Sequence, residues 1–430
     1  MSALSSRSGK RSLCWMLWFV AGLCLGPAQA DPPNVARPAV ATETVKTAAF
    51  TADTPEPTRF VVRGTRIIDL ERDAPLFFKG VGYSPYLPGE TPVYGAGPGD
   101  DARYAEHLHL LTGLGANYLH VFSRNNPAGF FAELDRTDLL YGQDIWLHSD
   151  TDDFLDPEYQ RSQLALIRSV IDEAYRSGRP DRLVLFSIGD ELQPWAIIQT
   201  DRAHPGVSEF VGRHIVVSGR TPTEVAIAKL MDAAIDYELT RYGRRHLYCH
   251  TSFTHVGPLA DRPDLHVPAS SAISPDIGDL ICLNIYTYSF GVVTSPPGSV
   301  TGSRYQGYLE ELAAGADRPI LIGQAGLPVT PDGTPPWLSA FGNHDLARAP
   351  DVFRAIWQDL RTARGHEKFC GLAFFEFHDE WWKSGQGPTD ADRHDGEDSE
   401  EWYGLYSSDG GRLHPKGRLP ETVRELFTTD

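Results

Sequence analysis

Several short apolar segments of the chain end on side chains that could do chemistry. Asp190 and Glu191 close the segment RLVLFSIGDE, and Gln324 closes RPILIGQAG just before a Gly/Pro turn. Glu376 lies in GLAFFEF, which leads into a stretch rich in carboxylates and aromatic rings. A carboxyl that protonates a leaving oxygen, with a second carboxyl opposite it, is the equipment of glycoside cleavage. No basic cluster suits phosphates at these ends, and no Ser–His–Asp group stands out.

The full set of polar side chains at such ends is larger. It comprises His120, Asp150, Asp190, Glu191, His250, Tyr286, Gln324, Glu376, His378, Asp379, Glu380, Trp381 and Trp382. A carboxylate after a strongly apolar strand is costly to bury without a purpose or a partner, which makes Glu191 a candidate. We expect His250 and His378 to be hydrogen-bonded structural residues. No spacing matches a metal site, the acidic stretch 390–401 is expected to be a solvated loop, and no cofactor is expected.

The elements that precede these side chains must position them. Short apolar segments alternate with amphipathic helical segments, and we count eight of them: FFKGVGY, NYLHVFS, DIWLHSD, RLVLFSIGDE, HLYCHTS, DLICLNIYTY, RPILIGQAG and GLAFFEF. Alternation of this kind predicts parallel strands joined by helical crossovers. Eight units predict an α/β fold, a closed (β/α)8 TIM barrel with loop insertions and chemistry at the carboxyl ends of its strands. An open doubly wound sheet is the rival, but the first strand turn lacks G-x-G-x-x-G.

Several motifs, in this order, resemble the clan A glycoside hydrolases, (β/α)8 enzymes that carry the acid/base and the nucleophile on strands four and seven. FFKGVGYSP resembles the first strand of the family 2 catalytic barrels and of the β-1,3-glucanosyltransferases. LLTGLGANYLHVFS resembles their second strand with its helix, and VLFSIGDEL the fourth strand. FFEFHDEWWK with EWYGLYSSDGGRLHPKG resembles the eighth strand and closing segment. The likeness spans about residues 60–420 and implies one catalytic-type barrel domain over residues 59–430.

The resemblance implies roles for individual residues. Glu191 falls on the acid/base position. Gln324 falls on the nucleophile position, where the family pattern has glutamate. Tyr286 falls on a tyrosine that often orients the nucleophile. Two further departures are that His120 stands where the family usually has an arginine, and Asp190 replaces the asparagine beside the acid/base.

The amide at position 324 leaves two functional interpretations open. A carboxamide cannot form a glycosyl-enzyme ester, and losing a nucleophile costs several powers of ten in rate, each worth about 1.4 kcal/mol. One interpretation is a glycoside hydrolase or transglycosylase that acts on a β-linked polysaccharide, with Glu191 as general acid. A second carboxylate from Glu376, Asp379 or Asp150 would then act as nucleophile or as base for a water. Glu376 could equally be a structural residue.

The alternative is a catalytically inactive barrel of the cell envelope that binds or scaffolds a glycan. Joint changes at positions 120, 190 and 324 favour this alternative more than one isolated change would. A deliberate amide substitution at 324 would leave the other two changes unexplained. Residues expected to contact sugar are His120, Asp190, Trp195, Tyr286, Tyr288, Asp379, Trp381 and Trp382.

The first thirty residues differ from the rest of the chain. Three basic residues precede the apolar run LCWMLWFVAGLCLG, and small residues around Ala30 follow it. This pattern predicts a signal peptide over residues 1–30 and a secreted or periplasmic protein. Residues 31–58 are rich in Ala, Thr and Pro and predict a flexible leader.

Charge and cysteine content restrict the partners and the chemistry. The formal net charge is −18, and the expected signal peptide holds positive but no negative side chains. Nucleic acid and, after signal cleavage, a membrane are therefore poor partners, whereas a neutral polysaccharide or oligosaccharide raises no such objection. Cys249, Cys282 and Cys370 lie in apolar stretches beyond the signal peptide. We expect them to be buried free thiols, with one disulfide at most.

Overall fold

The computed structural model describes most of the chain beyond the expected leader. The described residues are 59–92, 97–99, 102–123, 126–148, 151, 153–176, 179–253, 274, 276–286, 299, 301, 303–330, 345–383, 399–409 and 412–429. The expected signal peptide, the expected leader, Asp150, Tyr288 and most of the acidic stretch 390–401 lie outside these ranges.

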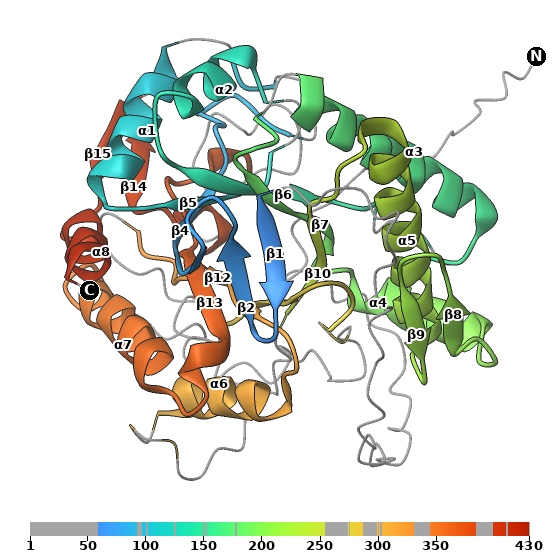
Figure 1. Cartoon of the computed structure of the whole chain (residues 1–430). Helices are drawn as coiled ribbons and strands as arrows, with labels where there is room; N and C mark the ends of the chain where they lie inside the picture. Colours follow the sequence, from blue (N-terminus) through green and yellow to red (C-terminus); the bar gives the residue numbers. More distant parts are fainter. Residues whose placement is uncertain are drawn as a thin grey trace, which may run out of the picture.

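Eight parallel strands form a closed barrel at the centre of the molecule (Figure 1). In order around the barrel they are β4 (Phe78–Tyr83), β5 (Tyr118–Val121), β6 (Leu140–Ile145), β7 (Leu183–Asp190), β10 (Leu247–Phe253), β11 (Ile281–Asn284), β12 (Ile320–Ala325) and β13 (Phe369–Phe374). Strand β13 pairs in parallel with β4 and closes the ring. The predicted (β/α)8 barrel is confirmed.

Helices surround the barrel, as the alternating pattern predicts (Figure 1). They are α1 (Arg103–Gly113), α2 (Ala128–Leu134), α3 (Pro157–Arg176), α4 (Pro194–Ala203), α5 (Pro222–Tyr242), α6 (Arg304–Gly315), α7 (Ala349–Thr362) and α8 (Leu419–Thr428). Helix α3 buries Ile167, Val170, Ile171 and Ala174, which lie on one face at helical spacing. Short 3-10 helices are η3 (His366–Lys368), η4 (Trp381–Lys383) and η5 (Ser399–Trp402).

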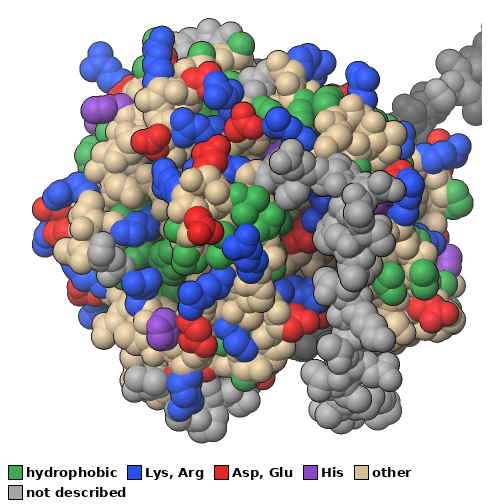
Figure 2. Space-filling model, in the orientation of Figure 1, with side chains coloured by type: hydrophobic (Ala, Val, Ile, Leu, Met, Phe, Trp, Pro, Cys, Tyr) green, Lys and Arg blue, Asp and Glu red, His purple; other side chains and the backbone are tan. Residues whose placement is uncertain are grey.

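A small antiparallel sheet closes the amino-terminal end of the barrel. It consists of β1 (Phe60–Arg63), β2 (Arg66–Asp69) and β3 (Ala74–Pro75). Phe60 and Ile67 pack into one hydrophobic cluster with barrel residues near the strand starts, such as Phe78 and Tyr118. The face that carries β1 and β2 shows positive and negative side chains intermixed around an apolar area (Figure 2). With this end plugged, the opposite end of the barrel is left for a site.

The structure also contains two β-hairpins outside the barrel. The first joins β8 (Glu209–Val211) to β9 (Val216–Ser218), and the second joins β14 (Tyr406–Asp409) to β15 (Arg412–Pro415). No helix in the described part of the chain combines the length and hydrophobicity that crossing a membrane requires. The three cysteines Cys249, Cys282 and Cys370 are buried free thiols of the barrel interior, as expected.

The third barrel strand lies earlier in the chain than the sequence analysis expected. We expected DIWLHSD, residues 144–150, but β6 runs from Leu140 to Ile145. Pairing with β5 sets this register, since Leu140 lies opposite Tyr118. Gly142 and two polar residues interrupt the apolar pattern, which hides the strand. The glycine is required because a Cβ at this position would collide with the hydroxyl of Tyr118. The shift places Asp144 inside the strand.

Candidate active site

Strand β7 delivers two neighbouring carboxylates to the open end of the barrel. Asp190 ends the strand, Glu191 follows it, and both side chains are partly exposed. Glu191 has a φ of 44°, a left-handed conformation that costs a non-glycine residue energy and is often found at functional sites. Its backbone N–H donates to the carbonyl of Thr251 on β10 at 3.2 Å, which fixes the turn.

Asn284, the last residue of β11, joins these two carboxylates. Its Nδ2 donates to Oδ1 of Asp190 at 2.9 Å and to Oε1 of Glu191 at 2.8 Å. Gly323 makes room for this amide, since a Cβ there would lie 2.8 Å from Asn284 Oδ1. The sequence analysis missed Asn284. The available signal was its place at a strand end, two residues before Tyr286.

Gln324 on β12 lies in the same network. Its Nε2 donates to Oδ2 of Asp190 at 3.2 Å, and its Oε1 accepts from the Tyr286 hydroxyl at 2.7 Å. Both oxygens of Asp190 thus accept from amides. Gln324 is 8% exposed, so the amide is nearly enclosed. The structure brings together four residues singled out from the sequence, namely Asp190, Glu191, Tyr286 and Gln324.

Burial makes these carboxyls weak acids. It raises the pKa of Glu191, against the hydrogen bond from Asn284 and the charge of Lys383. It raises the pKa of Asp190 well above its ordinary value, and the negative charges of Asp144 and Glu191 add to the effect. Asp144 on β6 is 1% exposed, and burial raises its pKa to about 7. The sequence analysis missed Asp144 because it lies inside a strand rather than at its end.

Lys383 in η4 is the cation of the site. Its Nζ lies 2.8 Å from Oε2 of Glu380, 3.5 Å from Oε1 of Glu376 and 4.5 Å from the centre of the Phe375 ring. Burial would lower the pKa of Lys383, but the two glutamates override it and the pKa is raised. The positive charge of Lys383 also favours the ionised form of Glu191. Lys383 was not among the sequence candidates.

Glu376 lies beneath this lysine. It is 1% exposed, and burial, with the negative charge of Glu380, raises its pKa well above the ordinary value. Burial also acts to raise the pKa of Glu380, but the positive charge of Lys383 outweighs burial. The pKa of Glu380 is therefore lowered. Of the two carboxyls, Glu376 is the weaker acid. An enclosed Glu376 with a raised pKa is a poor nucleophile.

Asp379 is held by the closing segment of the chain. It is fully buried, and its Oδ1 accepts from Nζ of Lys416 at 2.7 Å and from the backbone N–H of Gly404 at 2.9 Å. These contacts attach the end of β13 to the closing segment of the chain. The structure thus places Asp379 in an ion pair with Lys416.

His120 on β5 is fully buried among aromatic rings. Its Nδ1 lies 3.3 Å from the hydroxyl of Tyr118, and its ring centre lies 5.0 Å from that of Phe122. Burial lowers the pKa of His120 to about 4, so the ring is neutral near pH 7. His120 therefore brings no positive charge, unlike the arginine that the resemblance implies there.

The other two histidines bond to backbone carbonyls. The Nδ1 of His250 lies 2.8 Å from the carbonyl of Ile188, and the Nδ1 of His378 lies 2.9 Å from that of Asp379. Burial lowers the pKa of both, in the case of His250 to about 4. Both positions fit the structural role that we expected for them.

Aromatic side chains border the carboxylates. The ring of Trp382 lies 6.3 Å from that of Tyr86 and 6.4 Å from that of Trp146. The ring of Tyr286 lies 5.8 Å from that of Tyr403. Trp382 is buried and Trp381 is partly exposed. Among the large apolar side chains, Trp195 on α4 is 41% exposed, so it presents a ring to solvent.

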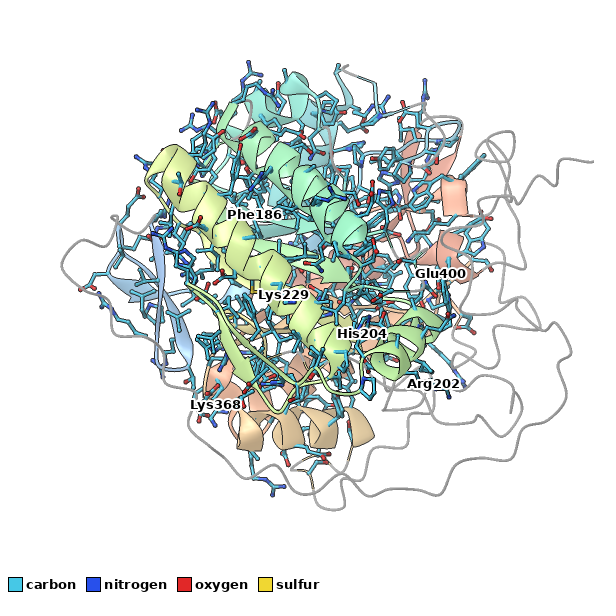
Figure 3. All side chains as sticks on the ribbon, turned by 90° about the vertical axis from the view of Figure 1, so that its right-hand side faces the viewer. Phe186, Arg202, His204, Lys229, Lys368 and Glu400 are labelled. Carbon is cyan, nitrogen blue, oxygen red and sulfur yellow. The ribbon has the colours of Figure 1, made fainter. Side chains whose placement is uncertain are left out.

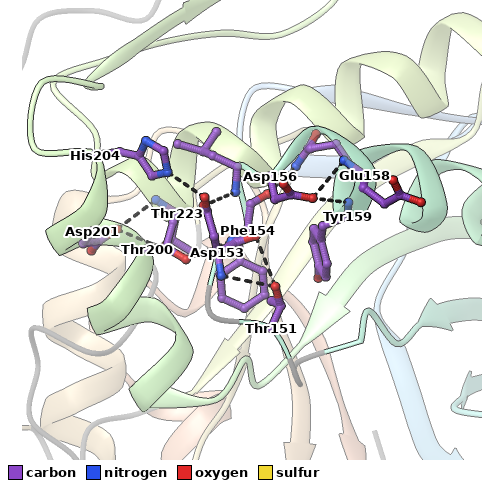
Figure 4. Close-up of polar contacts among 12 residues, drawn as sticks. Thr151, Asp153, Phe154, Asp156, Glu158, Tyr159, Thr200, Asp201, His204 and Thr223 are labelled. Atoms are coloured by element: carbon purple, nitrogen blue, oxygen red, sulfur yellow. Dashed lines mark hydrogen bonds and ion pairs between the residues drawn. The ribbon is translucent and has the colours of Figure 1, made fainter.

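Helix α4, which begins three residues after Glu191, is tied to the loop after β6. The backbone N–H of Phe154 donates to Oγ1 of Thr200 at 2.9 Å, and Nε2 of His204 lies 2.8 Å from Oδ2 of Asp153 (Figure 4). This bracing limits how far the turn at Glu191 can move.

A further carboxylate comes from η5. Glu400 is partly buried, and burial raises its pKa, as does the negative charge of Glu191. Figure 3 shows Glu400 toward the same side of the barrel as Arg202 and His204 of α4, and away from Lys368, which precedes β13. The sequence analysis assigned Glu400 to a solvated acidic loop and so missed it. Among the described residues, no three His, Cys, Asp or Glu side chains are grouped as for a metal ion.

Comparison with known proteins rests on structure. No family model matches the sequence, and no curated protein matches it. The GH2 β-galacturonidase from Eisenbergiella tayi bound to galacturonate is 14% identical with a TM-score of 0.55, over 86% of this chain and 54% of that one. The β-glucuronidase from Ruminococcus gnavus is 14% identical with a TM-score of 0.56, over 86% of this chain and 52% of that one.

A third match is a Saccharomyces cerevisiae Gas2p mutant in complex with laminaritetraose and laminaripentaose. It is 12% identical with a TM-score of 0.55, over 87% of this chain and 68% of that one. The present chain spans about half the length of the first two proteins. At this identity the likeness concerns the fold. The resemblance to the clan A glycoside hydrolase barrels is therefore confirmed at the level of the (β/α)8 fold, which this chain shares with them.

Proposed function

We propose that the chain is a glycoside hydrolase or transglycosylase that acts on a β-linked glycan, with Glu191 as the general acid and base. The observation that carries the proposal is the Asp190–Glu191 pair at the open end of the barrel, bridged by the single nitrogen Nδ2 of Asn284. The raised pKa of Glu191 favours a protonated carboxyl at moderately acidic pH. A glycosidic oxygen needs this kind of proton donor as its bond to carbon breaks.

Compared with the pattern that the resemblance implies, the second carboxyl of the site lies on β7 instead of β12. The resemblance implies an asparagine at 190 and a glutamate at 324, whereas this chain has Asp190 and Gln324. The two side chains are hydrogen-bonded to each other, so the exchange preserves one carboxylate and one amide in contact. Asp190 is then the acid that can stabilise positive charge on a reacting sugar.

A glycan-binding barrel without turnover is the second candidate. The observation in its favour is that position 324 is an amide and Glu376 is an enclosed acid with a raised pKa, so neither supports the ordinary nucleophile role. Partly exposed rings such as Trp195 and Trp381 could still stack on sugars.

The decisive experiment compares Glu191→Gln with a matched surface control. Glu158→Gln on α3 is suitable, since the Glu158 side chain is 86% exposed. β-linked hexasaccharides, with and without acetamido groups, are incubated with the full chain, and cleavage and transfer products are followed by mass spectrometry. We expect the rate to fall about 100- to 10,000-fold in Glu191→Gln and to stay unchanged in the control. Calorimetric binding without turnover in the unsubstituted chain would contradict the enzyme and support the binding barrel.

We also propose that the protein is exported, with residues 1–30 removed as a signal peptide. The basic residues followed by an apolar run and small residues at Ala30 support this. Mass spectrometry of the exported protein should find a mature chain that begins at Asp31. An intact amino terminus in the cytoplasm would contradict the proposal.

A further inference from the structure

The site holds a proton donor but not the usual nucleophile. Gln324 is an amide, Glu376 is enclosed beside Lys383 with a raised pKa, and Asp379 is bound to Lys416. The carboxyl next to the donor is Asp190. If the proposed function holds, none of the first three side chains is suited to attack the sugar, and the substrate itself is a further source of the attacking group.

Asp190 is built to accept hydrogen bonds from a neutral ligand. Its Oδ1 and Oδ2 are fixed by the neutral amides of Asn284 and Gln324 at 2.9 and 3.2 Å. A carboxyl oxygen can accept two hydrogen bonds, so Asp190 retains acceptor capacity beside its contacts with Asn284, Gln324 and Asp144. The side chain is partly exposed, so that a ligand can reach it. A ligand N–H is the complementary group.

The position of Asp190 relative to Glu191 indicates which part of a sugar it meets. The carboxylates of the two residues contact one nitrogen atom of Asn284. Glu191 must reach the oxygen on the anomeric carbon, C1, to protonate it. Because both carboxyls contact this one atom, Asp190 lies beside the proton donor, on the side where the substituent of the adjacent ring carbon, C2, can reach it.

We propose that the substrate supplies the nucleophile, and that it is a β-linked 2-acetamido-2-deoxy sugar. Its acetamido carbonyl oxygen attacks C1, Glu191 protonates the leaving oxygen, and Asp190 accepts the acetamido N–H. Gln324 holds Asp190 in place and leaves room where a carboxylate nucleophile would stand.

The steps balance without any further reactant than water. As the bond from C1 to the leaving oxygen breaks, the acetamido oxygen forms a bond to C1, and the Glu191 proton goes to the leaving group. The resulting five-membered oxazolinium ring carries one positive charge, and its N–H donates to an oxygen of the Asp190 carboxyl. Water then adds to C1, its proton returns to Glu191, and the ring opens to restore the acetamide with retained configuration.

The acidic surroundings argue for this neutral sugar over a uronic acid. Asp144 and Glu191 already lie close enough to raise the pKa of Asp190, and a substrate carboxylate would add to the repulsion. An unsubstituted glucan is neutral but has only a hydroxyl on C2, which offers no acyl oxygen. The acetamido group is neutral and provides both the attacking oxygen and the N–H donor.

The test compares hexasaccharides that differ at C2. The full chain is incubated with β-1,4-linked N-acetylglucosamine hexasaccharide, cellohexaose and laminarihexaose. We expect the acetamido substrate to be cleaved at least about a hundredfold faster, and Asp190→Asn to lose about a hundredfold in kcat, with Glu158→Gln unchanged. A thermal melt checks that Asp190→Asn is folded.

A second measurement tests whether the acetamido oxygen is the nucleophile. Replacing the acetamido group of a 4-nitrophenyl β-glycoside by trifluoroacetamido weakens the carbonyl oxygen but leaves the leaving group unchanged. We expect at least a tenfold fall in kcat/KM. An unchanged rate would overturn the inference. Equal or faster cleavage of the glucans would overturn the inference and leave the proposed function standing, and cleavage of none of the hexasaccharides would overturn both.

Discussion

The side-chain amide of Gln324 donates a 3.2 Å hydrogen bond to the carboxylate of Asp190, although their strands β12 and β7 are separated by two others around the barrel. A glutamate at 324 would bring two carboxylates to about this separation, and one of them would have to hold a proton. The identities of residues 190 and 324 are therefore linked: one position can be an acid if the other is an amide.

This link predicts a strong coupling in a double-mutant cycle. Gln324→Glu alone should lower the free energy of unfolding at pH 8 by about 1–3 kcal/mol, because a donor becomes a second acceptor. The paired carboxyls have raised pKa values when folded, so the loss should shrink as the pH falls below them. Adding Asp190→Asn should restore most of the stability at pH 8. Urea unfolding measures all four proteins, and additive effects would contradict the link.

Lys383 should set the alkaline limit of activity. Its charge favours ionised Glu191, so its removal in Lys383→Gln should raise the Glu191 pKa further. The acid form of Glu191 would then persist to higher pH, and the alkaline limb of kcat/KM should move to higher pH. Lys383→Arg keeps the charge and is the control. A downward shift in Lys383→Gln would show that Lys383 does not act on the general acid.

Asp144 should make the protein less stable as the pH rises. Burial raises its pKa from 3.8 to about 7, so the folded state holds the proton more tightly than the unfolded state. The stability gained at low pH is lost as the pH rises toward 7, by an amount on the order of 4 kcal/mol. Asp144→Asn stays neutral and should be more stable than the parent at pH 8, by a difference that shrinks as the pH falls toward 4.

A surface control separates this effect from charge in general. The side chain of Asp138 is 96% exposed, so Asp138→Asn should leave the pH dependence of unfolding unchanged. Thermal unfolding between pH 5 and 8 measures the three proteins. Parallel curves for the parent and Asp144→Asn would mean that Asp144 is ionised throughout.

The sequence alone predicted the barrel and the placement of the ends of strands β7 and β12 at one rim. Apolar runs of strand length between amphipathic helices indicate parallel strands, and the carboxyl ends of parallel barrel strands converge. The fourth, sixth and seventh apolar segments end near Asp190, Tyr286 and Gln324. These three residues therefore had to lie at one rim of the barrel. Their hydrogen bonds follow from this geometry.

The residues that the sequence analysis missed depend on contacts that no periodic pattern records. Asn284 joins strands β7 and β11 through one nitrogen, and Asp144 is a buried acid within a strand that Gly142 interrupts. Lys383 and Glu400 come from the closing segment, whose path over the barrel mouth is irregular. For the same reason, the hydrophobic pattern of the sequence could not show whether an acidic residue faces the substrate or anchors the closing segment.

Asp379 illustrates this distinction and can be tested. Its ion pair with Lys416 is buried, so Lys416→Met should leave an unpaired carboxylate and cost about 3–5 kcal/mol of unfolding free energy. The double variant Asp379→Asn/Lys416→Met should recover part of this loss, since no buried charge remains. Urea unfolding gives the stabilities, and calorimetry gives the glycan affinity of the folded fraction, which should not change. An Asp379→Asn variant that is fully stable but binds glycan weakly would instead place Asp379 in contact with substrate.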